Sequence, residues 1–193
     1  MNSRERILKA VRSAKPTGNI AAIPAVNPVS TGDTIVRFEA SVLKNGGRYF
    51  KVSGMEQAAE VITREYAAAH QIISTVPGIE GSRPLRVDDE PHTLADVDLA
   101  IVQGELGVAE NAAVWLDESR LVKRALPFIA QNLAILIREA DIVATLHEAY
   151  ARINVAEAGY GVFVSAPSKT ADIEQSLVIG AHGPRSLSVI VMP

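Results

Sequence analysis

Residues 165–174 hold several side chains that could bind a polar ligand. The segment joins an apolar stretch, expected to be a buried strand, to a helix that we expect over 170–178. A helix start can bind an anion, because its free N–H groups and its dipole favour negative charge. The segment's own carboxylates would repel a phosphate, so a mixed polar ligand or a cation suits it better. The candidate ligand-binding residues are Ser165, Ser168, Lys169, Thr170, Asp172 and Glu174. The alternative is a well-capped helix without a ligand.

Residues 180–185 form a second candidate segment, Gly-Ala-His-Gly-Pro-Arg. Gly180 and Gly183 allow a tight turn or a close approach to a ligand, and we count both as ligand-binding candidates. His182 could carry a proton or bind a metal ion. It could equally be an ordinary exposed histidine in a turn.

Glu110 is the third candidate. It lies between Ala109 and the apolar run that begins at Ala112. A carboxylate that enters a buried run has a raised pKa or a dedicated partner, as general acids, bases and nucleophiles require. The alternative is a turn glutamate that faces water. No ligand-spaced group of histidines and carboxylates is present, so we expect no metal site, and no Walker, GxSxG or HExxH motif occurs.

Helical and strand patterns alternate after residue 33, with apolar strands expected at 97–102, 112–116, 161–165 and 187–192. Such strands are buried on both faces, which is typical of a parallel sheet covered by helices. We therefore predict a three-layer α/β/α fold with a mostly parallel sheet. Loops at the carboxyl edge of such a sheet share a crevice. We expect Glu110, Ser168, Thr170, Asp172 and His182 to line that crevice.

The N-terminal part differs from the remainder. Residues 1–14 show helical spacing of apolar side chains, and 15–33 are rich in proline and glycine. We predict a division into a helix and linker at 1–33 and an α/β domain at 34–193. An amphipathic helix on such an arm packs on a partner subunit or on its own domain, and the sequence leaves both open.

Composition restricts the function further. The chain has no cysteine, so its own thiolates cannot hold an iron–sulfur cluster or a zinc ion. The net charge is −3 and the basic residues form no dense run, which argues against nucleic acid. The N-terminus lacks the apolar region of a secretory signal, and the longest apolar runs are too short for a membrane span. We expect a cytoplasmic protein.

Taken together, these segments resemble the LUD-domain proteins, and most closely the short lactate-utilisation protein C (LutC or YkgG-like) type. Residues 167–174 look like the family segment PSxTADIE, and residues 180–184 look like GxHGP. Residues 107–110 look like the start of a turn with the pattern A-E-T-G-T. Here the chain departs, because Asn111-Ala112-Ala113 replaces Thr-Gly-Thr.

The resemblance implies a NagB/RpiA/CoA-transferase-like fold and a role in oxidising L-lactate to pyruvate. It implies partner subunits that carry iron–sulfur clusters, while this chain carries none and binds no cofactor of its own. An alternative is a stand-alone binding protein or transferase-like enzyme for a small organic acid or nucleotide-like ligand, with Glu110 and the 165–185 loops as its site. A third hypothesis is a degenerate member with a structural role. Whether the chain is an enzyme stays open.

Overall fold

The computed structural model describes residues 2–15, 18, 32–173 and 176–193. Helix α1 (Ser3–Ser13) begins at a capping box. The Asn2 side chain accepts a hydrogen bond of 2.9 Å from the backbone N–H of Glu5, and the Glu5 carboxylate accepts one of 3.0 Å from the N–H of Asn2. No side chain of α1 is buried. The N-terminal helix is confirmed, whereas most of the predicted linker lies outside the described residues.

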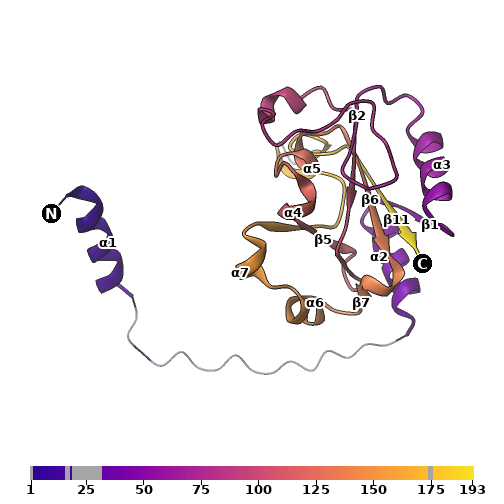
Figure 1. Cartoon of the computed structure of the whole chain (residues 1–193). Coiled ribbons are helices and arrows are strands. Elements are labelled where there is room, and N and C mark those ends of the chain that lie inside the picture. The colour runs from indigo at the N-terminus through magenta and orange to yellow at the C-terminus, as the bar shows by residue number, and fades with distance from the viewer. Residues whose placement is uncertain (1, 16–17, 19–31, 174–175) are drawn as a thin grey trace.

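A five-stranded parallel sheet forms the centre of the fold (Figure 1). Its strand order is β1-β11-β6-β3-β2, and every neighbouring pair is parallel. The parallel sheet predicted from the apolar strands is therefore confirmed. The strands are β1 (Arg48–Lys51), β2 (Ile72–Ser74), β3 (Leu99–Gln103), β6 (Asn132–Arg138) and β11 (Ser186–Met192).

A second, four-stranded sheet has the order β7-β4-β5-β8. It consists of β4 (Leu106–Val108), β5 (Ala113–Asp117), β7 (Ile142–Val143) and β8 (Gly161–Val164). Strand β5 runs antiparallel to both β4 and β8. The expectation that 112–116 and 161–165 belong to the parallel sheet is wrong. Both strands are apolar on two faces because other elements cover this second sheet as well.

The two faces of the parallel sheet have different coverings. Helix α3 (Met55–Glu65) packs on one face, where Val61 and Ile62 share a core with Ile101 and Leu136. On the other face, helix α2 (Thr34–Lys44) and strand β5 enclose a second core. The predicted three-layer arrangement is thus correct in outline, but one covering layer consists largely of the second sheet.

Short helices complete the body of the fold. They are η1 (Pro91–Leu94), α4 (Glu118–Leu121), α5 (Leu126–Ile129), η2 (Glu139–Asp141), α6 (Leu146–Arg152) and α7 (Val155–Ala158). The helix expected over 141–153 begins only at Leu146, because Ile142 and Val143 pair with β4 as strand β7. Among the described residues, no helix is long and apolar enough to cross a membrane.

Residues 169–173 and 176–179 pair as two antiparallel strands of a β-hairpin, so the helix predicted over 170–178 is wrong. Strand β9 (Lys169–Ile173) pairs antiparallel with β10 (Ser176–Ile179). Lys169 lies opposite Ile179, so the chain returns to its starting point. The sequence has capping residues typical of a helix start, but pairing between its two halves determines the structure instead.

Candidate functional site

The two segments singled out from the sequence meet in the structure. The backbone N–H of Ser168 donates a hydrogen bond of 2.8 Å to the carbonyl of Pro184. The N–H of Gly180 donates one of 3.0 Å to the carbonyl of Ser168. A helix would have placed residue 182 far from Ser168, whereas the hairpin brings the 180–184 turn back beside it. The two segments therefore form one joined unit.

The two glycines of this turn differ in how strongly their surroundings demand glycine. Gly180 has φ +82°, and a Cβ atom there would lie 2.2 Å from the Cγ atom of Arg185. A Cβ atom on Gly183 would lie 3.2 Å from the Cβ atom of Ser168. Backbone conformation and close packing thus explain Gly180 without a ligand, whereas at Gly183 the contact is only tight.

This unit lies at the amino edge of the parallel sheet, contrary to our expectation. The turn ends at Arg185, directly before β11, and the N–H of Arg185 donates a hydrogen bond of 2.8 Å to the carbonyl of Gln131, directly before β6. The predicted position at the carboxyl edge is wrong. The reason is the pairing of β9 with β10, which brings Ile179 back opposite Lys169, so that the chain enters β11 beside Ser168.

A polar cluster of Asn45, Asn111, Ser165 and Lys169 joins the hairpin to two other parts of the chain. The Asn45 Nδ2 atom donates hydrogen bonds of 2.9 Å to the Asn111 carbonyl and to the Ser165 Oγ. The Ser165 hydroxyl also donates to the Asn111 carbonyl. The Lys169 Nζ atom donates to the Asn45 carbonyl at 2.5 Å. We call these four residues the Asn45 cluster.

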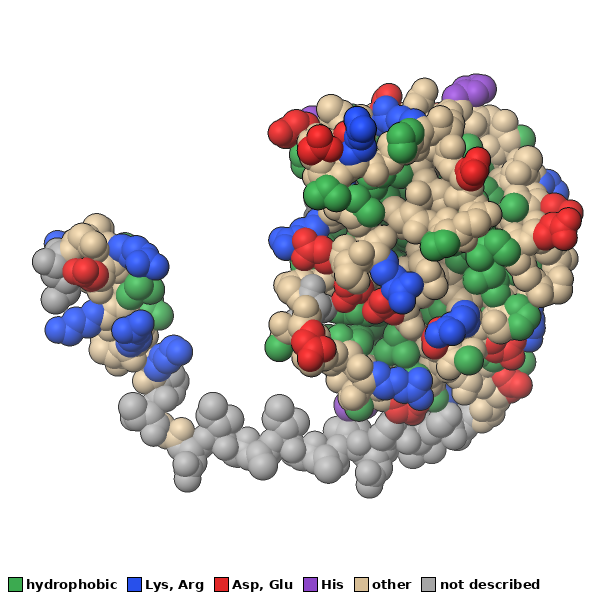
Figure 2. Space-filling view, in the orientation of Figure 1, with side chains coloured by type: hydrophobic (Ala, Val, Ile, Leu, Met, Phe, Trp, Pro, Cys, Tyr) green, Lys and Arg blue, Asp and Glu red, His purple; other side chains and the backbone are tan. Residues whose placement is uncertain are grey.

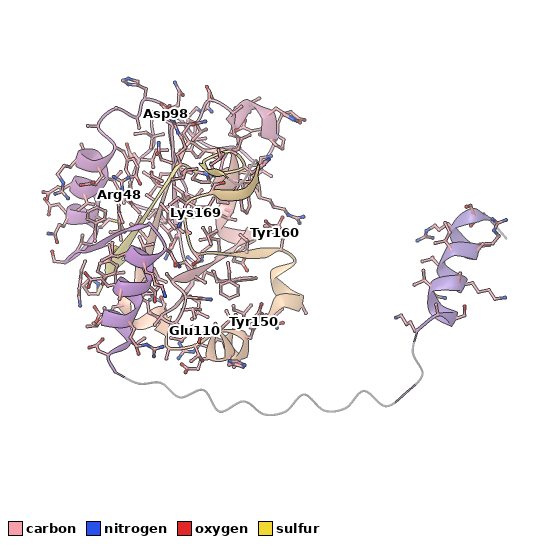
Figure 3. The ribbon with its side chains drawn as sticks, turned by 180° about the vertical axis from the view of Figure 1, so that it is seen from behind. Arg48, Asp98, Glu110, Tyr150, Tyr160 and Lys169 are labelled. Carbon is pink, nitrogen blue, oxygen red and sulfur yellow. The ribbon has the colours of Figure 1, made fainter. Side chains whose placement is uncertain are left out.

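Glu110 lies apart from the hairpin (Figure 3). Its Oε1 atom accepts a hydrogen bond of 2.8 Å from the N–H of Leu146, in the first turn of α6, and its side chain is exposed. Glu110 follows β4 of the second sheet, which is why it points toward α6. The single cleft expected to join Glu110 with Ser168 and Thr170 is wrong. Only its neighbour, Asn111, reaches the Asn45 cluster.

The turn that departs from the family pattern has an unusual backbone. Ala112 is fully buried and has φ +58°, in the left-handed region that favours glycine. Glycine is the residue that the resembled family pattern has at this place. The turn therefore has a conformation suited to glycine, while its alanine methyl group packs in the core.

The remaining predicted residues have mixed positions. His182 is exposed in the turn before β11, and Thr170 is partly buried opposite Val178. The side chain of Asp172 and all of Glu174 lie outside the described part of the chain. Within the described ranges, no three histidines, aspartates or glutamates come together as a metal site would require.

A polar hollow of about 430 Å³ lies beside this unit at the amino edge of the sheet. Arg48 and Arg185 both line it. The Arg48 Nη2 atom donates to the Ser186 Oγ at 3.3 Å, and that hydroxyl donates to the Asn132 Oδ1 at 2.7 Å. Asp98 also lines the hollow, and hydrogen bonds from the backbone N–H groups of Gln71 and His70 lower its pKa. The hollow thus offers two arginines, two carboxylates and amide groups to a small polar solute, and one of the arginines, Arg48, is paired with Glu65 at 3.1 Å.

Sequence reasoning missed Asn45, Asn132 and Arg48 as neighbours of the candidate segments. The only signal at Asn45 is the pattern Asn-Gly-Gly after a helical stretch, which is typical of a helix end. That pattern says nothing about contact with residues more than sixty positions away. The parallel sheet creates these neighbours by bringing the amino ends of β1, β6 and β11 together.

Comparisons with known proteins agree over most of the chain. A family model described as the LUD domain matches residues 89–192. A protein named Lactate utilization protein C from Deinococcus radiodurans is 28% identical over 96% of this chain and 92% of its own length. Lactate utilization protein C 1 from Bacillus mycoides is 33% identical, but the match covers 49% of this chain and 43% of that protein. The crystal structure of a DUF162 family protein from Deinococcus radiodurans superimposes with a TM-score of 0.67 at 25% identity, covering 86% of this chain and all of that one.

Proposed function

The chain belongs to the LUD domain family, and from that membership we propose that it is a subunit or accessory protein of a system that oxidises L-lactate to pyruvate. The observation that carries this proposal is the match to a lactate utilization protein C over 96% of the chain. The match includes the joined unit at the amino edge of the sheet. A shared fold alone would be weaker support, because one fold serves many functions.

The proposal assigns electron transfer to other subunits. Oxidation of lactate to pyruvate releases two electrons and two protons, so an acceptor is needed. Iron–sulfur clusters are held mainly by cysteine thiolates, and this chain has no cysteine. We therefore place the clusters on partner subunits, and no step of electron transfer passes through residues of this chain.

Deletion of the gene tests the proposal. The deletion strain is expected to lose growth on L-lactate as sole carbon source but to grow normally on pyruvate, the product. A plasmid copy should restore growth, and a tagged copy should co-purify with iron–sulfur proteins. Normal growth on L-lactate together with no co-purified iron–sulfur protein would reject it.

A second candidate function is the binding of a small organic acid, and the polar hollow at the amino edge favours it. Arg185 directly follows residues 180–184, the turn that resembles the family segment GxHGP, and it lines the hollow. Within the described residues it makes no ion pair. A thermal-shift series with L-lactate, pyruvate and nucleotides tests this function, since a saturating ligand raises the melting temperature. The shift should disappear in Arg185→Ala and persist in Arg86→Ala, whose arginine lies outside the hollow. No shift with any of these compounds would reject this candidate.

A further inference from the structure

Helix α1 has an exposed apolar face that no other described residue covers. Its apolar side chains Ile7, Leu8 and Val11 are 60%, 39% and 55% exposed. Basic side chains surround them, as the blue and green atoms of the helix show in Figure 2. An apolar stripe bordered by positive charge is typical of a helix that binds an acidic surface.

Charge is distributed unequally between this helix and the remainder of the chain. Residues 1–15 hold five lysines and arginines against one glutamate, a net charge of +4. The other 178 residues hold 14 basic and 21 acidic side chains, a net charge of −7. The chain therefore combines a basic N-terminal helix with an acidic remainder, and opposite net charges favour association.

The body has a groove whose surface complements α1. The groove is about 560 Å³ in volume and lies between β4, β5, α6 and α7. Its apolar wall contains Leu106, Trp115 and Ile153. Four carboxylates border this wall: Glu105, Asp117, Asp141 and Glu157. We call this feature the acidic groove, and Figure 2 shows red carboxylates gathered beside a hollow in the region of α4 and α7.

The carboxylates of the groove are only partly neutralised. Glu105 pairs with Arg120 at 2.5 Å, and Asp141 pairs with Arg138 at 2.6 Å. Glu157 makes no ion pair within the described part of the chain. One arginine, Arg152, also lines the groove. The lining groups keep an excess of negative charge, which suits a basic helix.

We propose that α1 docks in the acidic groove of its own chain, with its apolar stripe against Trp115 and its basic side chains beside the carboxylates. The covalent connection permits this, because the 20 residues between Ser13 and Thr34 can span up to about 65 Å. An intramolecular partner also has a high effective concentration. Docking would cover the exposed apolar side chains of α1, whereas Leu106 and Trp115 of the groove are already largely buried, so charge supplies much of the attraction.

Crosslinking of the full chain tests the proposal cleanly, because the natural sequence has no cysteine. The variant Ala10→Cys with Asn154→Cys places one thiol on α1 and one on the rim of the groove. A short bismaleimide should link them within one chain, about tenfold faster than in the control Ala10→Cys with Val87→Cys. Val87 is highly exposed and lies outside the groove.

Charge reversal tests the electrostatic part. Lys9→Glu with Arg12→Glu, added to the double-cysteine variant, should reduce crosslinking to the level of the Val87 control. Glu157→Lys should act in the same direction, whereas Asp88→Lys, with the same change of net charge outside the groove, should not. High salt should also lower the rate, because it screens exposed charges.

Three outcomes would overturn the proposal. One is crosslinking no faster than in the Val87 control. Another is a covalent dimer on a denaturing gel, which would place α1 in a second copy. The third is sedimentation of the unlabelled chain with phosphatidylglycerol vesicles that Lys9→Glu with Arg12→Glu abolishes, which would assign α1 to a lipid surface. None of these readouts depends on growth on lactate, so failure here leaves the proposed function untouched.

Discussion

The Nδ2 atom of Asn45 donates a hydrogen bond of 2.9 Å to the Oγ atom of Ser165, although 120 positions separate the two residues in the sequence. The same Nδ2 atom donates to the Asn111 carbonyl at 2.9 Å. One amide group therefore connects the end of α2, the turn after β4 and the end of β8. These hydrogen bonds connect the segment that leads into the β9–β10 hairpin with α2 and with the second sheet.

Asn45→Ala is expected to lower the free energy of unfolding by about 1–3 kcal/mol, because it removes the donor to the partly buried Ser165 Oγ and one of the two donors to the Asn111 carbonyl. Urea denaturation measures the change. Lys44→Ala, at the preceding exposed position, should change stability by no more than about 0.5 kcal/mol. Equal effects of the two substitutions would contradict the importance of the Asn45 cluster.

Glu110 is expected to act as a helix cap. Its carboxylate accepts the N–H of Leu146, so Glu110→Ala should cost about 1 kcal/mol of stability. Glu110→Gln keeps an oxygen acceptor and should preserve both stability and growth on L-lactate. Loss of growth in Glu110→Gln, with an unchanged melting temperature, would instead establish a chemical role for the carboxylate.

Val122 lies in a strained turn. It has φ +61° and ψ −43°, and the N–H of Lys123 donates to the carbonyl of Leu121 at 2.6 Å, which is the pattern of a classic γ-turn. A β-branched residue is disfavoured there, so Val122→Gly should raise the free energy of unfolding by about 1 kcal/mol. Val36→Gly provides the comparison, because Val36 is also exposed but lies in helix α2, where glycine should destabilise. Destabilisation by both substitutions would show that the turn is unstrained.

Tyr49 is expected to make stability depend on alkaline pH. Burial, together with the nearby carboxylates of Glu39, Glu139 and Asp33, raises the pKa of Tyr49 to about 12. The contribution of protonated Tyr49 to the free energy of unfolding is fully present below the pKa of tyrosine in the unfolded chain, which is about 10. It is lost as the pH rises to about 12, because only the unfolded chain then releases the proton. Tyr49→Phe should therefore show a smaller loss of stability over this range in urea denaturation.

The same substitution has a second consequence at neutral pH. The Tyr49 hydroxyl is buried and has no hydrogen-bond partner within the described residues. Its removal should leave stability unchanged or slightly higher at pH 7. A loss of more than about 1 kcal/mol at pH 7 would show that the hydroxyl has a partner that this structure does not contain.

The parallel sheet could be predicted from sequence because its central strands β3, β6 and β11 are largely apolar and do not alternate. The same signal misassigned β5 and β8, since a strand of the second sheet that is covered on both faces has the same composition. Strand β4 was missed because Leu106-Gly107-Val108 is short and contains glycine. The hydrophobic pattern of a segment indicates whether a strand is buried, but it does not indicate which sheet the strand joins.

The candidate segments could also be found from sequence, but their position could not. Thr170 and Asp172 suit a helix start, yet the chain forms a hairpin in which Thr170 pairs with Val178. Because a hairpin forms in place of the predicted helix, the two candidate segments lie at the amino edge of the parallel sheet and not at its carboxyl edge. Asn45 and Asn132 lie beside these segments because of the order of the strands in the sheet, and the order of strands cannot be predicted from a local sequence pattern.

Strand order also has a consequence for synthesis on the ribosome. Strand β11 lies between β1 and β6, yet it follows both of them in the sequence. While the chain is being made, β1 has no neighbour, and β6 exposes one unpaired edge. The sheet cannot close until residues 186–192 have left the exit tunnel, so β1 and the open edge of β6 stay unpaired until the last of the five strands is available. A nascent chain stalled before residue 186 should therefore be sensitive to protease and bound by chaperones.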